Sequence, residues 1–188
     1  MAHSKETVDR LERQVRTAAA FLEEVKGHEL EAVVFNKALF YADLAALRDL
    51  GRTMTGSSYT AAPLGPMLTN FKILVKALEV RGIAKQVEDG DARPIRAIRR
   101  IDQQLPDEEA EIVRRVSAAA SAWTSTGVSD LSHENIGWIL GRNAPNKRIN
   151  LIIAMQQIVD SDPWLDAPLT EEENEAVSRG MSDLGPWH

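Results

Sequence analysis

The chain has 188 residues, a net charge of −6, 44% hydrophobic residues and no cysteine. This size and apolar content argue against wholesale disorder, and the lack of cysteine excludes disulfides, thiolate nucleophiles and cysteine-bound zinc or iron–sulfur sites. The acidic balance disfavours whole-chain attraction to nucleic acid or anionic membranes, and the longest apolar run, residues 151–155, is too short to span a bilayer. We therefore expect a soluble, cytoplasmic protein without a cofactor.

The N-terminal region shows the repeat of an amphipathic helix over residues 7–26. Its apolar positions recur at spacings of three and four, and Gly27 follows them as a stop signal. The stripe consists of Val8, Leu11, Val15, Ala18, Leu22 and Val25. Three heptads with an alanine in the seam form a weak coiled coil, which favours packing on the protein's own domain. Leu11, Val15 and Leu22 are the alternative candidates for contact with a partner.

A second helix is predicted over residues 31–50 and ends at Gly51. It is apolar on nearly all sides, which is typical of a central, buried helix. Asn36, Lys37 and Asp43 interrupt this apolar surface. Because a buried polar group needs a hydrogen-bond partner, we expect Lys37 and Asp43 to be at least partly buried and mutually supported by hydrogen bonds near the following loop.

That loop, "GRTMTGSSYTAAPLGPM", covers residues 51–67 and contains small hydroxyl residues on both sides of Gly56. Gly56 suits a turn with positive φ, and a short strand is predicted near Tyr59. We expect Gly65 and Pro66 to begin a helix over residues 67–80, because proline suits a first helical turn. The glycine spacing matches neither a Walker loop nor a dinucleotide fingerprint, so phosphate binding is not indicated.

Residues 83–100 follow this helix and resemble a β-hairpin with Asp89-Gly90 at its turn. A helix followed by a hairpin is typical of the end of a winged-helix unit. Four arginines in this segment could contact phosphates: Arg93, Arg96, Arg99 and Arg100. We favour intramolecular ion pairing instead, since the acidic run at residues 107–111 offers partners.

The rest of the chain predicts three further helices. One opens at Pro106 with favourable acidic residues and ends before Gly127, a short one is capped by Ser132, and the last covers residues 148–159. The fold class is therefore mainly α with a small antiparallel β-hairpin or wing (α+β), winged-helix-like in its middle. We divide it into an N-terminal amphipathic helix (1–28), a compact helical domain (29–160) and an acidic C-terminal tail (161–188).

Catalytic and metal-binding patterns are not indicated. The histidines do not have metal-ligand spacing, and the segment from His133 to Trp138 matches a zincin helix for only two residues. No serine nucleophile elbow occurs, and the carboxylate runs at 107–111 and 171–175 are typical of helix starts and solvated faces. We expect a protein that is not an enzyme and has no catalytic, cofactor or metal residues, with His133 hydrogen-bonded or solvated beside the Ser132 cap.

Residues 36–67, "NKALFYADLAALRDLGRTMTGSSYTAAPLGPM", resemble the signature of the Panacea domain of SocA-like antitoxins and phage-associated GepA-like proteins. A second patch, "LSHENIGW", resembles the downstream element of the same family. The resemblance covers roughly residues 32–140. The matching residues are Lys37, Tyr41, Asp43, Gly51, Thr55, Gly56, Tyr59, Gly65 and Pro66, followed by Ser132, His133 and Trp138.

This resemblance implies an antitoxin of a bacterial or phage toxin–antitoxin pair. Such a protein binds a cognate protein toxin directly, either masking it or delivering it to a protease; a homodimer is a further partner to consider, while nucleic acid and membrane are disfavoured. Residues 51–67 then form a scaffold element. Recognition is expected partly outside the shared signature, so we predict that removing residues 1–28 leaves a folded core but weakens toxin binding. A winged-helix DNA-binding regulator is the alternative function.

Overall fold

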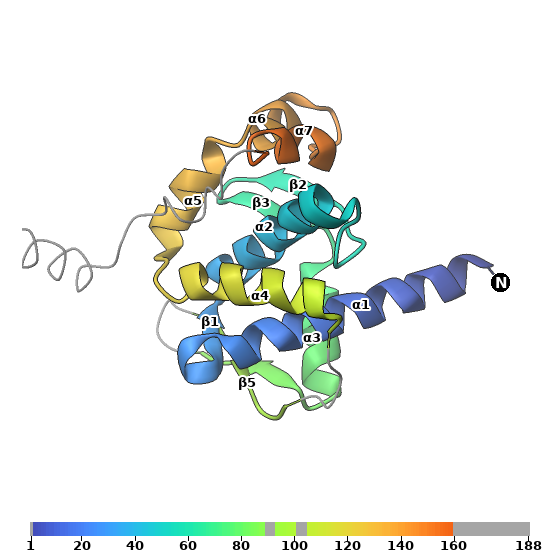
Figure 1. Ribbon diagram of the computed structural model, residues 1–188, viewed down its shortest axis with the longest axis vertical. Helices are drawn as coiled ribbons and strands as arrows, with labels where there is room; N and C mark the ends of the chain where they lie inside the picture. Colours follow the sequence, from blue (N-terminus) through green and yellow to red (C-terminus); the bar gives the residue numbers. More distant parts are fainter. Residues whose placement is uncertain (1, 89–92, 101–104, 160–188) are drawn as a thin grey trace, which may run out of the picture.

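The computed structural model describes residues 2–88, 93–100 and 105–159, with the side chains from residue 5 onward. This part is mainly helical, with two small antiparallel sheets (Figure 1), which confirms the predicted fold class. The helices are α1 (Ala2–Glu24), α2 (Ala32–Leu50), α3 (Phe71–Val80), α4 (Asp107–Ala120), α5 (Ser125–His133), α6 (Ile136–Asn143) and α7 (Leu151–Gln156). The strands are β1 (Glu29–Glu31), β2 (Tyr59–Ala62), β3 (Gly65–Leu68), β4 (Ala84–Gln86) and β5 (Pro94–Ala97).

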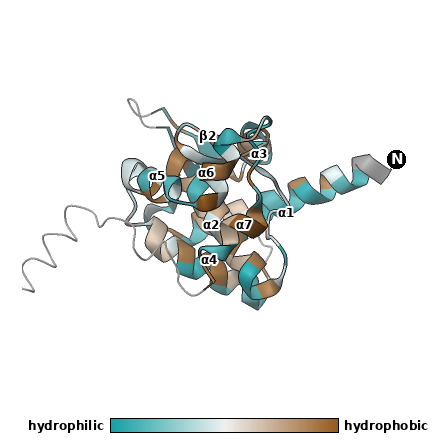
Figure 2. Ribbon diagram, turned by 90° about the horizontal axis from the view of Figure 1, so that it is seen from above, coloured by the Kyte–Doolittle hydropathy of each residue, from teal (hydrophilic) through white to brown (hydrophobic). Residues whose placement is uncertain are grey.

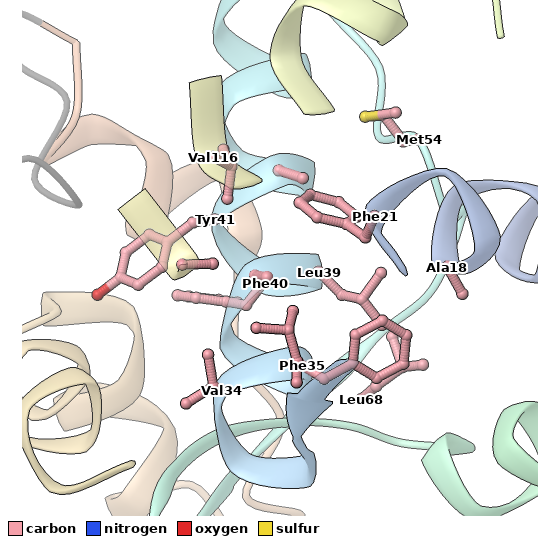
Figure 3. Close-up of a cluster of buried hydrophobic side chains, with 14 of the residues drawn as sticks. Ala18, Phe21, Val34, Phe35, Leu39, Phe40, Tyr41, Met54, Leu68 and Val116 are labelled. Atoms are coloured by element: carbon pink, nitrogen blue, oxygen red, sulfur yellow. The ribbon is translucent and has the colours of Figure 1, made fainter. Parts of the chain in front are cut away.

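Helix α2 is the central element of the core. Its residues 34–46 are all buried, as its apolar composition predicts, and Gly51 ends it in the left-handed conformation with φ of 68°. Side chains from several other elements surround α2 (Figure 3), among them Phe21 of α1, Leu68 of β3 and Val116 of α4. The ring of Phe40 meets that of Tyr59 edge-on, with the ring centroids 5.2 Å apart. The hydrophobic contacts of α2 thus link distant parts of the chain around one helix.

Helix α1 packs against α3 and α4, and its C-terminal half belongs to this same core. Val15 is 3% exposed, and Ala18 and Leu22 are fully buried. The first turns project from the body of the molecule (Figure 1), and residues 5–9 are exposed. The C-terminal half of the N-terminal helix therefore covers one side of the hydrophobic core. A short 3₁₀ turn, Lys26–His28, joins it to β1.

The hairpin predicted after α3 is present as β4 and β5, which pair antiparallel. Its Asp89-Gly90 turn lies outside the described residues. The sequence did not suggest β1, which pairs with the other edge of β5 and gives the order β1-β5-β4. A strand of three residues carries too little pattern to be recognised, and pairing with β5 defines it.

The prediction that Gly65 and Pro66 begin a helix is wrong. Both residues lie in β3, which pairs antiparallel with β2, and α3 begins only at Phe71. Proline is compatible with a first helical turn and also with an edge strand, so the local sequence does not separate the two. Here the carbonyl of Pro66 accepts hydrogen bonds from α2, and this tertiary contact favours the strand.

The helix boundaries near the C-terminus also differ from the prediction. Thr124 caps α5, and its hydroxyl accepts from the backbone N–H of Gly127 at 3.0 Å, so Gly127 lies inside this helix. Ser132 is buried near the end of α5, and Asn135 caps α6 in its place. The last helix begins after Asn150 and is shorter than expected. The N-caps are thus the hydroxyl of Thr124 and the amide side chains of Asn135 and Asn150, which the local sequence did not single out.

Candidate functional site

Asp43 of α2 is fully buried and forms a polar cluster with two residues of the loop that follows. Its carboxylate accepts from the backbone N–H of Thr55 at 2.8 Å, from the Thr55 hydroxyl, and from the hydroxyl of Tyr59 at 2.9 Å. We call Asp43, Thr55 and Tyr59 the Asp43 cluster. The bonds tie the middle of α2 to the loop and to β2, which places residues 51–59 against the helix.

Burial sets the electrostatics of this cluster. Desolvation raises the pKa of Asp43 to about 6 from its ordinary 3.8, although hydrogen bonds from Thr55, Tyr59 and Met54 oppose the rise. Burial, together with the Asp43 charge, raises the pKa of Tyr59 well above its usual 10.0, so this phenol keeps its proton. The cluster is thus an enclosed acceptor held by neutral donors.

Nearly two turns earlier on α2, Asn36 and Lys37 bind the backbone of β3. Asn36 donates to the carbonyl of Pro66 at 2.6 Å and accepts from the N–H of Leu68 at 3.0 Å, so its amide pairs with β3 as a neighbouring strand would. The ammonium of Lys37 donates to the same Pro66 carbonyl at 3.1 Å. Asn36 was not among the predicted signature residues. Its position in an apolar helix next to Lys37 was the signal that could have identified it.

Lys37 is 2% exposed and makes no ion pair with a described residue. Its side chain lines an apolar cavity of about 440 Å³ between the first turns of α2 and the β2–β3 hairpin. Desolvation lowers its pKa to about 8 from 10.5, because an apolar environment disfavours the charged form. The prediction that Lys37 and Asp43 are buried near the loop is confirmed, but the two bind separate partners.

Gly65 and Ser132 show why the two signature patches belong together. Gly65 has a φ of 97°, and a Cβ there would collide with the hydroxyl of Ser132 and lie 2.7 Å from Cε of Lys37. The Ser132 hydroxyl donates to the carbonyl of Ser129 at 2.8 Å. The close packing of α2, β3 and α5 at this point therefore requires glycine. Gly56 is similar on a smaller scale, since its missing side chain leaves room for the guanidinium of Arg13.

His133 and Trp138 form an aromatic stack between α5 and α6. Their ring centroids lie 4.2 Å apart with an interplanar angle of 23°, and the guanidinium carbon of Arg142 lies 4.8 Å from the centre of the Trp138 ring. The indole N–H of Trp138 donates to the carbonyl of Ala62 at 3.1 Å. Nε2 of His133 is buried without a hydrogen-bond partner in the described chain, so the expected hydrogen bonding or solvation is absent at this ring nitrogen, while the residue as a whole is partly exposed. The stack holds α6 on β2. Tyr41 is buried in the core and meets Trp123 edge-on at 5.7 Å.

The residues proposed for toxin contact on the N-terminal helix are not free for it. Val15 and Leu22 are buried inside the protein's own core, and Leu11 is partly buried against it. The favoured interpretation of this stripe, packing on its own domain, is confirmed. Periodicity alone could not separate the two because both place the same residues on one face.

The four arginines of the hairpin segment are all exposed. Arg96 pairs with Glu29 at 2.5 Å, and Arg99 donates to the carbonyl of Arg81 at 2.8 Å; Arg93 and Arg100 also face solvent. Intramolecular ion pairing is therefore confirmed for Arg96, but the expected partner is wrong, because within residues 107–111 Glu109 binds Arg52 and Glu111 binds Arg114. Antiparallel pairing of β1 with β5 brings Glu29 beside Arg96 instead.

The described residues also bear on metal-binding and membrane-spanning classes of protein. They contain no group of three or more His, Asp or Glu side chains placed to hold a metal ion. None of their helices is long and apolar enough to cross a membrane. The signature residues instead gather around α2, in the Asp43 cluster, at Gly65, and in the His133–Trp138 stack.

These features define an α+β domain whose central helix is held by buried polar side chains. A family model described as "Antitoxin SocA-like, Panacea domain" matches residues 35–139, which is more than half of the chain. The chain therefore belongs to the SocA-like antitoxin family with the Panacea domain. Comparison with curated proteins and with solved structures gave no match.

Proposed function

We propose that this protein is an antitoxin that neutralises a cognate protein toxin by binding it directly, without catalysis. The observation that carries the proposal is the match of residues 35–139 to the antitoxin SocA-like domain. The toxin, its contact surface and the fate of the bound toxin are part of the proposal. Masking of the toxin and delivery to a protease are the two modes of action that it includes.

The geometry of the signature residues supports a binding scaffold. Asp43, Lys37 and Ser132 are enclosed and bond to the protein's own backbone and hydroxyl groups. Enclosed groups with internal partners hold the fold together and do not meet a substrate. Recognition of a partner then falls to exposed elements around this scaffold.

Co-expression with the protein encoded by the adjacent open reading frame tests the proposal. The neighbouring product alone should arrest growth, and co-expression should restore it. Size-exclusion chromatography and calorimetry of the purified pair should then show a stable complex. Rescue in a protease-deficient host favours masking, whereas rescue that needs the protease favours delivery. Toxicity that persists on co-expression, with no complex formed, would contradict an antitoxin role.

One observation keeps the DNA-binding alternative open to test. Helix α3 is followed by the β4–β5 hairpin, and the exposed Arg93 and Arg100 lie at this hairpin. A gel shift with the protein's own promoter compares the wild type with a variant in which Arg93, Arg96, Arg99 and Arg100 are replaced by Gln. We expect weak binding by both and unchanged toxin rescue. Tight, salt-dependent binding that the variant loses would favour the regulator instead.

A further inference from the structure

Helix α6 presents an apolar stripe to solvent. Ile136, Ile139 and Leu140 are 36%, 41% and 50% exposed, and spacings of three and four place them on one side of the helix. The opposite side carries Gly137 and Gly141, which lie against neighbouring elements. Figure 2 looks onto this end of the molecule and shows hydrophobic segments along α6 and α7. The helix thus has a buried side formed by Gly137, Trp138 and Gly141 and an exposed side made of large aliphatic residues.

The chain directly after this stripe is basic, although the protein as a whole is acidic. Arg142, Lys147 and Arg148 are exposed, and residues 135–159 contain no Asp or Glu. None of the three cations makes an ion pair with a described residue. This segment therefore has a charge of opposite sign to the net −6 of the chain. Uncompensated cations beside an apolar stripe suit a partner surface that is acidic and apolar.

Several contacts fix α6 in place. The side chain of Asn135 caps the helix through the N–H groups of Gly137 and Trp138, and it donates to the carbonyl of Ala154 at 3.1 Å. The indole of Trp138 binds the backbone of β2. A Cβ at Gly137 would come within 2.5 Å of the Cβ of Ala154, so α6 and α7 pack closely. A face that is ordered before binding loses little conformational entropy when a partner docks.

The exposed apolar position at Ile73 on α3 lacks this combination. On α3, Ile73 is 59% exposed, but the nearby cations Lys76 and Arg81 are paired with Glu79 and Glu12. Paired charges offer a partner little electrostatic complementarity. The phosphate backbone of nucleic acid could meet the cations but offers no apolar surface to the stripe. Nucleic acid is therefore a weaker candidate than a protein. A second copy that docks through the same face is disfavoured, because the cations of the two copies would meet.

We propose that the toxin docks on the α6 face, defined as Ile136, Ile139 and Leu140 with the adjacent Arg142, Lys147 and Arg148. The partner segment is an acidic one that places apolar side chains on the stripe and carboxylates beside the cations. The proposal rests on the proposed antitoxin function and names its contact surface. Apolar anchors of this kind dominate the free energy of binding, while the charges set orientation and association rate.

Calorimetry with the adjacent gene product tests the face with two variants of the full chain. Ile139→Ser/Leu140→Ser removes the stripe, and Lys147→Glu/Arg148→Glu reverses the charge. We expect each variant to raise the dissociation constant of the toxin complex by about tenfold or more. The affinity of the charge variant should also depend much less on salt concentration than that of the wild type. Ile73→Ser is the matched control at an exposed apolar residue of α3, and it should stay within about twofold of the wild type. Thermal melts by circular dichroism confirm that all variants fold.

The outcomes separate this proposal from the antitoxin function. If the wild type binds and both face variants bind equally well, the α6 face is wrong and the function stands. If the wild type binds no toxin, both fall together. A dimer in light scattering that the stripe variant dissociates, with toxin affinity unchanged, would make the face a homodimer contact. Duplex binding lost only in the charge variant, again with toxin affinity unchanged, would make it a nucleic-acid contact. Either result overturns the proposal.

Discussion

The Asp43 cluster and the α6 face treat their polar and apolar groups in opposite ways. In the cluster, a carboxylate is fully buried and each of its partners is a donor of the same domain. On the α6 face, large apolar side chains are exposed and the cations beside them have no ion-pair partner in the described chain. A satisfied interior holds a shape, whereas an unsatisfied surface leaves free energy available for binding.

This difference predicts that buried and exposed residues of the domain serve different roles, stability and binding. Change in the interior should alter stability first and affinity only through unfolding. Change on the α6 face should alter affinity and leave the melt nearly unchanged. The following predictions probe the interior half of this comparison, and the calorimetry proposed above probes the surface half.

The largest effect is expected from deleting residues 1–28. The sequence suggested that a folded core would remain, but Phe21 and Leu22 are fully buried in that core. Removing them exposes apolar side chains of α2 and α4 to solvent, so we expect loss of the cooperative thermal melt. Deleting only residues 2–9, whose described side chains from residue 5 are exposed, is the control and should leave the melt intact. A cooperative melt of the longer deletion would show that the core folds without α1, and α1 would again be a candidate for toxin contact.

The next effect concerns Gly65. Replacement by Ala requires a positive φ and overlaps with Ser132 and Lys37, so we expect a loss of about 2–5 kcal/mol in the free energy of unfolding. Gly51→Ala is the matched control, because Gly51 also has a positive φ but nothing lies within 4 Å of its added Cβ. That control should cost about 1 kcal/mol. Equal losses in urea titrations of the two variants would mean that the packing at Gly65 contributes nothing.

A smaller effect is expected at Asp43. Asp43→Ala leaves the N–H of Thr55 and the hydroxyl of Tyr59 buried without an acceptor, which costs about 1–3 kcal/mol. Asp49→Ala serves as control, since Asp49 binds Arg48 and Arg115 near the surface and should cost under about 1 kcal/mol. Toxin affinity measured below the melting temperature should be unchanged. A variant with normal stability and abolished affinity would show that Asp43 is a binding residue.

The smallest effect, on the order of 1 kcal/mol, is expected for Lys37→Met near neutral pH, and its sign is stabilising. Folding lowers the pKa of Lys37 from 10.5 to about 8, so its stabilising contribution is complete above pH 10.5 and is lost as the pH falls through 8. The wild type should therefore gain stability relative to the variant as the pH rises from 7.5 to 9.5. Urea titrations at four pH values measure this difference. A constant difference would show that Lys37 does not change its proton affinity on folding.

Much of the architecture followed from local pattern. The all-round apolar surface of α2 indicated a buried central helix, Gly51 its end, and the run around Asp89-Gly90 a hairpin after α3. The signature residues identified the family that the match later showed. These features were predictable because helix periodicity, glycine stop signals and hairpin turns depend on neighbours in the chain.

Other features depended on contacts between segments far apart in sequence. Pro66 lies in a strand because Asn36 and Lys37 of α2 bind its carbonyl, and Arg96 pairs with Glu29 because β1 aligns with β5. The N-terminal stripe and the α6 stripe both consist of apolar residues at helical spacing. The first is buried from Val15 onward and the second is exposed, because the remaining elements cover the C-terminal half of α1 and, on α6, only the side that carries Gly137, Trp138 and Gly141. Periodicity defines which residues share a helix face, but only the packing of the whole chain decides whether that face meets the core or the solvent.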